Sequence, residues 1–232
     1  MPKIHGLTQT TLLDYPGKIA ATIFLGGCNF RCPFCQNGAL VLAPSQEPEI
    51  PEKEILDFLQ KRHKILEGVC ISGGEPTLSK DLKDFICKIR NMGYSVKLDT
   101  NGTHPEVLKD LVDNNLIQMA AVDIKARPDN YPSLTGMLNP SIDSVKETVD
   151  FLIHGNLEYE FRTTVVKELH DRNDFIEIGK WLKGCRAYYL QAYKDSDNVI
   201  QPGFSSYSYD ELLEFRSILK ETIPVVEIRG ID

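Results

Sequence analysis

Three cysteines in one short segment are the strongest chemical signal in this sequence. Cys28, Cys32 and Cys35 are spaced as CxxxCxxC, and an aromatic residue, Phe34, directly precedes the third. Iron–sulfur clusters and closed zinc sites usually take four protein ligands, so three thiolates leave one metal position open to a small molecule. A metal site with an open position is typical of catalysis, and the segment therefore predicts a catalytic metal centre.

The other cysteines do not extend this group. Cys70, Cys87 and Cys185 stand among apolar neighbours and are interpreted as small buried residues. The chain has five histidines, and none lies at a ligand-like spacing from the three-cysteine segment. A non-enzymatic zinc or redox module, completed by a distant histidine, stays open as an alternative from a different class.

Composition indicates the class of protein to which these ligands belong. The 232 residues are 42% hydrophobic and 25% charged, which is ordinary for one globular domain. Neither a secretory signal nor a stretch long enough to span a membrane is expected. A net charge of -7 argues against extended contact with phosphate backbones. We expect a single cytoplasmic domain over residues 1–232, with no nucleic-acid partner and no membrane partner.

Strands and helices alternate along the chain. Short β-branched runs alternate with amphipathic segments, which is the pattern of repeated βα units around a parallel sheet. Ser79, Gly93 and Gly184 are read as helix start and stop signals. The segment from Lys3 to Gly17 is expected to cover a sheet edge or the base, and Ala43 to Pro51 to be a surface loop. The predicted strands are 19–25, 67–72, 95–99, 117–124, 158–166, 187–193 and 224–229, and the predicted helices are 51–64, 79–92, 105–114, 142–154, 172–183 and 208–221.

Polar residues follow or end most of the predicted strands. Because function in parallel α/β sheets collects at the carboxyl ends of the strands, these side chains are expected to converge on one cavity. Each alone could be a turn residue or a solvated side chain. They are the three cysteines, Gly73-Gly74-Glu75-Pro76, Asp99-Thr100-Asn101-Gly102, Asp123-Ile124-Lys125, Arg162, Gln191 and Tyr193.

The cysteine motif and the Gly73-Gly74-Glu75 motif together resemble those of radical S-adenosylmethionine (SAM) enzymes, over nearly the whole chain. The stretch from Gly6, through Leu13-Asp14-Tyr15-Pro16-Gly17, to Cys35-Gln36-Asn37 further resembles the activases of glycyl radical enzymes. Within that group it is most similar to the long form of the activating protein of anaerobic ribonucleoside-triphosphate reductase. The resemblance implies an α/β fold, a partial (β/α)6 barrel with an open lateral side.

The resemblance also implies an oxidoreductase activity. Cys28, Cys32 and Cys35 would ligate a [4Fe–4S] cluster whose open iron chelates SAM. Reductive cleavage of SAM would give a 5′-deoxyadenosyl radical, which takes a hydrogen atom from a glycine of a partner. The implied partners are a glycyl radical enzyme, anaerobic ribonucleoside-triphosphate reductase first among them, and a flavodoxin- or ferredoxin-type electron donor.

Further site residues are carried over from the same resemblance. Asp99, Thr100 and Asp123 resemble a monovalent-cation site, and such oxygen donors suit a hard cation. Tyr193 stands where related pyruvate formate-lyase activases have a histidine. The implied SAM contacts are Phe34 and Gln36 near the adenine, Gly73 and Gly74 at the methionine moiety, Glu75 orienting that strand end, Asp123 and Lys125 beside the cofactor, and Arg162 at its carboxylate.

Two alternatives stay within the radical SAM enzymes. One is an activase of pyruvate formate-lyase or of another glycyl radical enzyme. The other is an enzyme of small-molecule substrates such as a deazapurine synthase, which has similar length and motif spacing. No further cysteine cluster lies between Cys35 and Gly73 or after Arg162, so a second iron–sulfur cluster is not expected.

Overall fold

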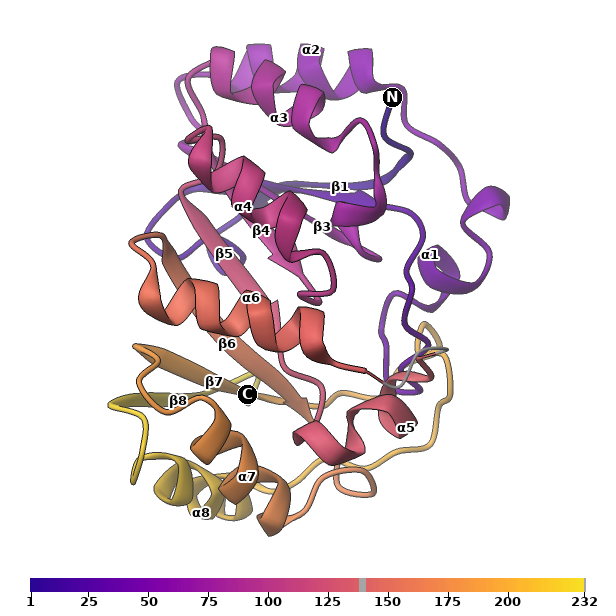
Figure 1. The fold of residues 1–232 in the computed structure, drawn as a ribbon. Coiled ribbons are helices and arrows are strands. Elements are labelled where there is room, and N and C mark those ends of the chain that lie inside the picture. Colours follow the sequence, from indigo (N-terminus) through magenta and orange to yellow (C-terminus); the bar gives the residue numbers. More distant parts are fainter. Residues whose placement is uncertain (138–140, 232) are drawn as a thin grey trace. The chain divides into compact units, whose positions relative to one another are not determined.

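The computed structural model describes residues 1–137 and 141–231 (Figure 1). Within them the strands follow the order β1-β2-β3-β4-β5-β6-β7-β8, so each strand neighbours those adjacent in sequence, and β1 and β8 are the two ends of an unclosed sheet. The chain divides into two compact units, each described by itself. The first comprises Met1–Asn29, Ala39–Thr100 and His104–Ala120, and the second Phe30–Gly38, Asn101–Thr103 and Ala121–Asp232.

The first unit is built on β1 (Ile4–Thr11), β2 (Ala20–Leu25), β3 (Gly68–Gly73) and β4 (Ser95–Thr100). β1 runs antiparallel to β2, whereas β2, β3 and β4 are parallel. Helices α2 (Glu52–Arg62), α3 (Leu82–Asn91) and α4 (Pro105–Asp113) accompany these strands, with short turns η1 (Pro44–Gln46) and η2 (Pro76–Leu78). Each helix buries one apolar stripe, made of Ile55 and Leu59 in α2, Phe85, Ile86 and Ile89 in α3, and Leu108 and Leu111 in α4.

The second unit contains β6 (Glu158–Val165), β7 (Ala187–Ala192) and β8 (Val225–Arg229), all parallel, together with the end of β5 (Met119–Asp123). Its helices are η3 (Pro128–Asn130), α5 (Tyr131–Thr135), α6 (Asp143–His154), α7 (Arg172–Trp181) and α8 (Tyr209–Leu219). α7 and α8 lie side by side (Figure 1), and the rings of Phe175 and Phe215 stack between them at 4.4 Å. Capping boxes at Asp171 and Ser208 fix where these two helices begin.

All seven predicted strands and six predicted helices are present, with ends that differ by a few residues. Gly93 and Gly184 follow α3 and α7 with positive φ, as expected of helix C-termini. The expectation for Ser79 is wrong, because Asp81 occupies the N-cap position of α3, which begins at Leu82, while Ser79 ends η2. The predicted surface loop contains η1, and its Ile50 forms an isolated antiparallel bridge with Ile4.

Strand β1, helices α1 and α5 and the three short 3-10 turns of the described residues escaped prediction. β1 is an edge strand in which Ile4 is the buried residue, so its polar sequence lacks the apolar alternation of a half-buried strand. α1 (Gly38–Leu42) and α5 have five residues each, too few to show a helical period. Among the described helices, none combines the length and the apolar character that a membrane span requires. One domain over residues 1–232 stays a prediction.

Candidate functional site

The predicted site residues fall in both compact units, and each group is described by itself. In the second unit, Cys32 is buried and Cys35 is half-buried, with the Cys35 N–H donating to the Cys32 carbonyl at 3.0 Å. The backbone around Pro33 and Cys35 is held by the β7–α8 loop (193–208). The Cys35 carbonyl accepts from the Ile200 N–H at 3.1 Å, and the Pro33 carbonyl accepts from the Gln201 N–H at 2.8 Å. These bonds fix the backbone that presents two of the cysteines.

Side chains add to this contact. The Gln36 amide donates to the Lys194 carbonyl at 3.0 Å, so this residue, predicted near the adenine, also ties the two loops together. Tyr193 is buried and donates its hydroxyl to Asp195 at 2.6 Å, while the Gly203 N–H donates to the other carboxylate oxygen at 2.9 Å. Burial, together with the bond to Asp195, raises the pKa of Tyr193 to about 12. Tyr193 thus orders the β7–α8 loop from within.

A cluster of charges lies at the ends of β5 and β6. Asp123 accepts from Arg162 Nε at 3.0 Å, and its other oxygen lies 3.5 Å from Lys125 Nζ. Burial alone would lower the pKa of Lys125, but the negative charge of Asp123, together with that of Cys32 and Cys35 in their thiolate form, reverses this and raises it. The Lys125 ammonium therefore stays charged beside two of the cysteines. The structure brings these five predicted residues together in the second unit.

His170 supports this cluster and was not predicted from sequence. Its Nε2–H donates to the Lys125 carbonyl at 2.8 Å, and its Nδ1 accepts from the Val166 N–H at 3.1 Å. Burial lowers the pKa of His170, which is consistent with this neutral form. The ring of the buried Phe34 meets it edge-on at 6.1 Å. No sequence spacing pointed to His170, because it acts through backbone groups that only the fold brings near.

In the first unit, the end of β3 lies against the backbone that leads into Cys28. The Gly74 N–H donates to the Leu25 carbonyl at 2.8 Å, and the Glu75 N–H to the Gly27 carbonyl at 2.7 Å. A Cβ at Gly74 would lie 1.9 Å from the Gly27 oxygen and 3.3 Å from the Cys28 nitrogen. The two glycines are therefore required for this close approach of two chain segments. Gly73 also has a positive φ of 119°, a backbone conformation that favours glycine.

Glu75 is almost fully buried and anchors the same strand end. One carboxylate oxygen accepts from the Thr77 N–H at 3.1 Å, from the Thr77 hydroxyl at 2.5 Å and from the Thr100 hydroxyl at 2.7 Å. Since the Thr77 hydroxyl donates to Glu75, its contact of 3.1 Å with His104 Nδ1 uses the Thr77 oxygen as acceptor. Thr77 and His104 were not predicted, and they extend the network around the predicted Glu75.

The residues of the predicted cation site have other partners. Asp99 lies 2.5 Å from the ammonium of the buried Lys97, and Thr100 donates to Glu75 as described. Asp123 is paired with Arg162 and Lys125. The monovalent-cation site stays a prediction. A cation bound there would compete with these partners for the oxygen atoms of Asp99, Thr100 and Asp123.

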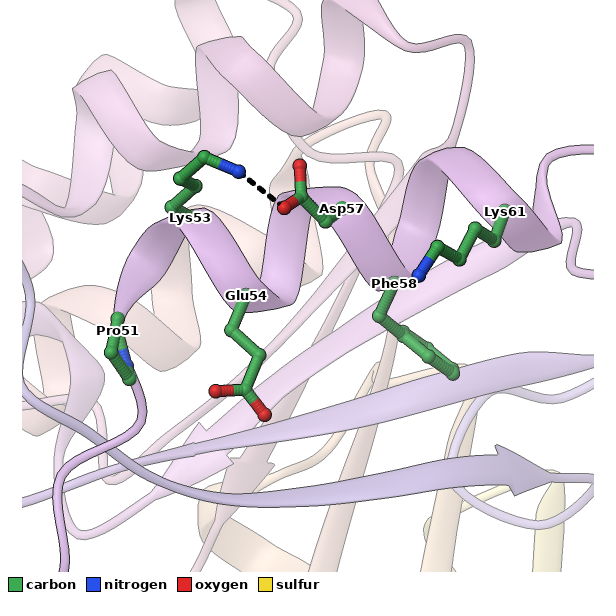
Figure 2. A pocket seen from close by; sticks show the side chains of 6 residues that line it. All are labelled: Pro51, Lys53, Glu54, Asp57, Phe58 and Lys61. Atoms are coloured by element: carbon green, nitrogen blue, oxygen red, sulfur yellow. Dashed lines mark hydrogen bonds and ion pairs between the residues drawn. The ribbon is translucent and has the colours of Figure 1, made fainter.

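One surface hollow carries none of the predicted residues. It lies along α2 and is lined by exposed and half-buried side chains, with Lys53 directed toward Asp57 at 2.5 Å (Figure 2). No catalytic constellation is present among its lining residues, Pro51, Lys53, Glu54, Asp57, Phe58 and Lys61. We assign no function to it.

The cysteine segment fits an iron–sulfur ligand set. All six cysteines of the chain are described, and none forms a disulfide. Thiolates carry negative charge, and the charged Lys125 beside Cys32 and Cys35 suits a thiolate-ligated cluster. Cys70 and Cys185 are buried as expected, whereas Cys87 in α3 is only half-buried. The residue types therefore suit a thiolate-ligated cluster, although the described part of the chain has no group of three or more His, Cys, Asp or Glu side chains already gathered to hold a metal ion. The ligand set Cys28, Cys32 and Cys35 stays a prediction.

Comparisons with known proteins agree with this chemistry. A Methanocaldococcus jannaschii protein provisionally named a glycyl-radical enzyme activating enzyme is 34% identical, over 99% of this chain and 96% of that protein. A 7-carboxy-7-deazaguanine synthase of Thermoplasma acidophilum is 35% identical, over 77% of this chain and 78% of that enzyme. A GTP 3′,8-cyclase of Helicobacter pylori is 28% identical, over 67% of this chain and 49% of that enzyme.

Solved structures share the fold. Streptococcus suis SuiB bound to S-adenosylmethionine is similar with a TM-score of 0.68 and 15% identity, over 88% of this chain and 48% of that chain. QueE from Escherichia coli is similar with a TM-score of 0.57 and 16% identity, over 99% of this chain and 94% of that chain. The family model described as the radical SAM superfamily matches residues 22–182, which are well over half of the sequence. The chain belongs to the radical SAM superfamily.

Proposed function

We propose that this protein is an activase that takes a hydrogen atom from a glycine of a partner glycyl radical enzyme. The observation that carries the proposal is the likeness to the M. jannaschii activase-named protein, which extends over 99% of this chain and 96% of that protein. The matches to the deazaguanine synthase and the GTP cyclase cover smaller shares of both chains. Anaerobic ribonucleoside-triphosphate reductase is the proposed partner, on the motif around Leu13-Asp14-Tyr15-Pro16-Gly17.

The radical SAM family implies a [4Fe–4S] cluster and SAM as cofactors. Cys28, Cys32 and Cys35 are the proposed cluster ligands. When bound, the cluster supplies the electron for reductive cleavage of SAM. Arg162 is the proposed partner of the SAM carboxylate, since cationic donors form strong hydrogen bonds to such groups, and Lys125 is proposed to contact the cofactor beside it.

The remaining proposed contacts follow the same assignment. Gly73 and Gly74 present backbone groups to the methionine moiety, and Glu75 holds their strand end through Thr77 and Thr100. Phe34 and Gln36 are the proposed neighbours of the adenine, and Asp123 orients Lys125 and Arg162. We further propose a cytoplasmic location, a flavodoxin- or ferredoxin-type donor, and a monovalent cation bound by Asp99, Thr100 and Asp123.

The proposal is tested by anaerobic reconstitution with iron and sulfide, reduction, and mixing with SAM and purified anaerobic ribonucleoside-triphosphate reductase. The expected result is the doublet spin-resonance signal of a glycyl radical, with methionine and 5′-deoxyadenosine formed in step. The Cys32→Ala variant is the control and gives neither signal nor products. Pyruvate formate-lyase in place of the reductase tests the partner assignment.

A small-molecule reaction is the second candidate. It is favoured by the 35% identity to the T. acidophilum 7-carboxy-7-deazaguanine synthase. The same reconstituted protein, supplied with free GTP or with the substrate of that synthase, distinguishes the two functions. Conversion of a free substrate, with no radical on either partner protein, would replace the activase proposal.

A further inference from the structure

A buried carboxylate on β6 has two guanidinium groups as partners. Glu160 is 2% exposed, and Arg229 of β8 donates to both of its oxygens, at 3.2 and 2.9 Å. Arg162 lies two residues along β6 from Glu160, and its NH1 is 3.8 Å from the same carboxylate. A buried charge is costly unless it is compensated, so Glu160 must keep a cationic partner. The bidentate partner is Arg229.

Arg229 is itself held in place. Its guanidinium carbon lies 3.4 Å from the centre of the Tyr189 ring, a stacking geometry that arginine favours. Tyr189 pairs with Arg162 in the ladder between β6 and β7, and Gln191 pairs with Arg229 in the next ladder. The side chains of Arg162, Tyr189 and Arg229 therefore lie on one face of these three strands.

Arg162 is shared between two carboxylates. Its Nε donates to Asp123 at 3.0 Å, its NH2 is 3.4 Å from the other oxygen of Asp123, and its NH1 faces Glu160 at the longer distance of 3.8 Å. The two short contacts direct the guanidinium toward Asp123 and thereby toward Lys125. Arg162, whose NH1 lies 3.8 Å from Glu160, is a second cation within reach of this buried carboxylate if Arg229 is removed. The charge of Glu160 would then draw Arg162 away from Asp123.

We propose that Arg229 is a positioning residue for SAM binding. By neutralising Glu160, Arg229 leaves Arg162 paired with Asp123 and so preserves the arrangement of Asp123, Lys125 and Arg162. The inference rests on the proposed role of Arg162 toward the SAM carboxylate and on the proposed contact of Lys125 with SAM. Arg229 acts through Glu160 and is assigned no contact with the cofactor.

The test measures equilibrium binding of SAM to the reconstituted protein under anaerobic conditions, with iron content and melting temperature determined for each variant. Arg229→Ala is expected to weaken SAM binding about tenfold, within the usual range of coupling in charge networks, while iron content stays at the parental value. Adding Glu160→Gln to Arg229→Ala removes the charge that draws Arg162 away. The double variant is expected to bind SAM within about threefold of the parent.

Two further variants complete the design. Glu160→Gln alone is expected to keep parental affinity, and it remains informative if Arg229→Ala does not fold. Glu227→Gln, an exposed carboxylate on the same strand as Arg229, is the matched control and is expected to change nothing.

The proposal is overturned if Arg229→Ala binds SAM like the parent, or if Glu160→Gln fails to restore the double variant. Loss of affinity in Glu160→Gln alone would equally overturn it. A loss that tracks the melting temperature across the variants would assign Arg229 to the fold instead. Failure of the activase proposal would appear separately, as an absent glycyl radical despite parental SAM binding.

Discussion

Replacement of Gly74 by alanine tests how the end of β3 positions the first cluster cysteine. The added Cβ would lie 1.9 Å from the Gly27 carbonyl oxygen and 2.6 Å from its carbon. Contacts of a Cβ below 3.0 Å are essentially absent from proteins, so the two segments must separate by about 1.1 Å. The atoms in the way belong to backbone, which cannot rotate aside as a side chain can. The shift therefore reaches Cys28.

The expected magnitudes follow from this displacement. Overpacking of this kind costs about 1–3 kcal/mol of unfolding free energy. Weakening the bond between the Glu75 N–H and the Gly27 carbonyl, now 2.7 Å, adds about 1 kcal/mol. A chain of this length then loses about 5–10 °C in melting temperature. Misplacement of a reacting group by about 1 Å lowers rates roughly 100-fold, and we expect SAM cleavage to fall by that factor.

The assay follows 5′-deoxyadenosine formation by the reduced, reconstituted protein, with iron content and thermal unfolding measured on the same samples. Gly17→Ala is the matched control. Gly17 has a φ of 74° but no atom within 4 Å of an added Cβ, so its replacement costs about 1–2 kcal/mol of strain without displacing Cys28. If Gly74→Ala cleaves SAM as fast as Gly17→Ala, the close approach does not position the cysteine and the reasoning is wrong.

Three further predictions concern the cysteine ligands, His170 and Tyr193. Cys32→Ala is expected to abolish the brown chromophore and SAM cleavage, whereas Cys87→Ser is expected to keep both. Iron content and visible absorbance are measured for each variant. A Cys32→Ala protein with the parental iron content would contradict the proposed ligand set. Burial lowers the pKa of His170 in the folded state below the value of about 6.5 that it has in the unfolded chain. Between these two pKa values the unfolded state binds a proton that the folded state does not bind. The free energy of unfolding therefore falls as the pH falls toward the folded-state pKa. His170→Gln is expected to flatten this dependence in denaturant unfolding at pH 5 to 8, and an unchanged slope would assign it to other groups. Tyr193→Phe removes the hydroxyl that bonds Asp195 and is expected to loosen the β7–α8 loop, seen as faster hydrogen exchange at Ile200 and Gln201 and about 1 kcal/mol of lost stability. Unchanged exchange would show that the backbone bonds suffice.

The parallel strands and their order along the chain were predictable because buried strands carry continuous apolar runs. β3 reads Gly68-Val69-Cys70-Ile71 and β5 reads Met119-Ala120-Ala121-Val122, and both were found where expected. β1 was missed because its pairing with β2 is decided by backbone hydrogen bonds at the sheet edge, which its polar side chains do not report. The start of α3 was misread because Ser79 ends η2 and Asp81 occupies the N-cap position of α3.

The sequence by itself determined the family of this protein, since the CxxxCxxC spacing of Cys28, Cys32 and Cys35 and the Gly73-Gly74 pair at the end of β3 are local patterns in the chain. The tertiary structure alone decided the partners of those residues. Glu160 meets Arg229 across 69 positions, and His170 reaches Lys125 across 45. Such contacts depend on strand register and on the burial of charge, and neither leaves a local pattern in the chain.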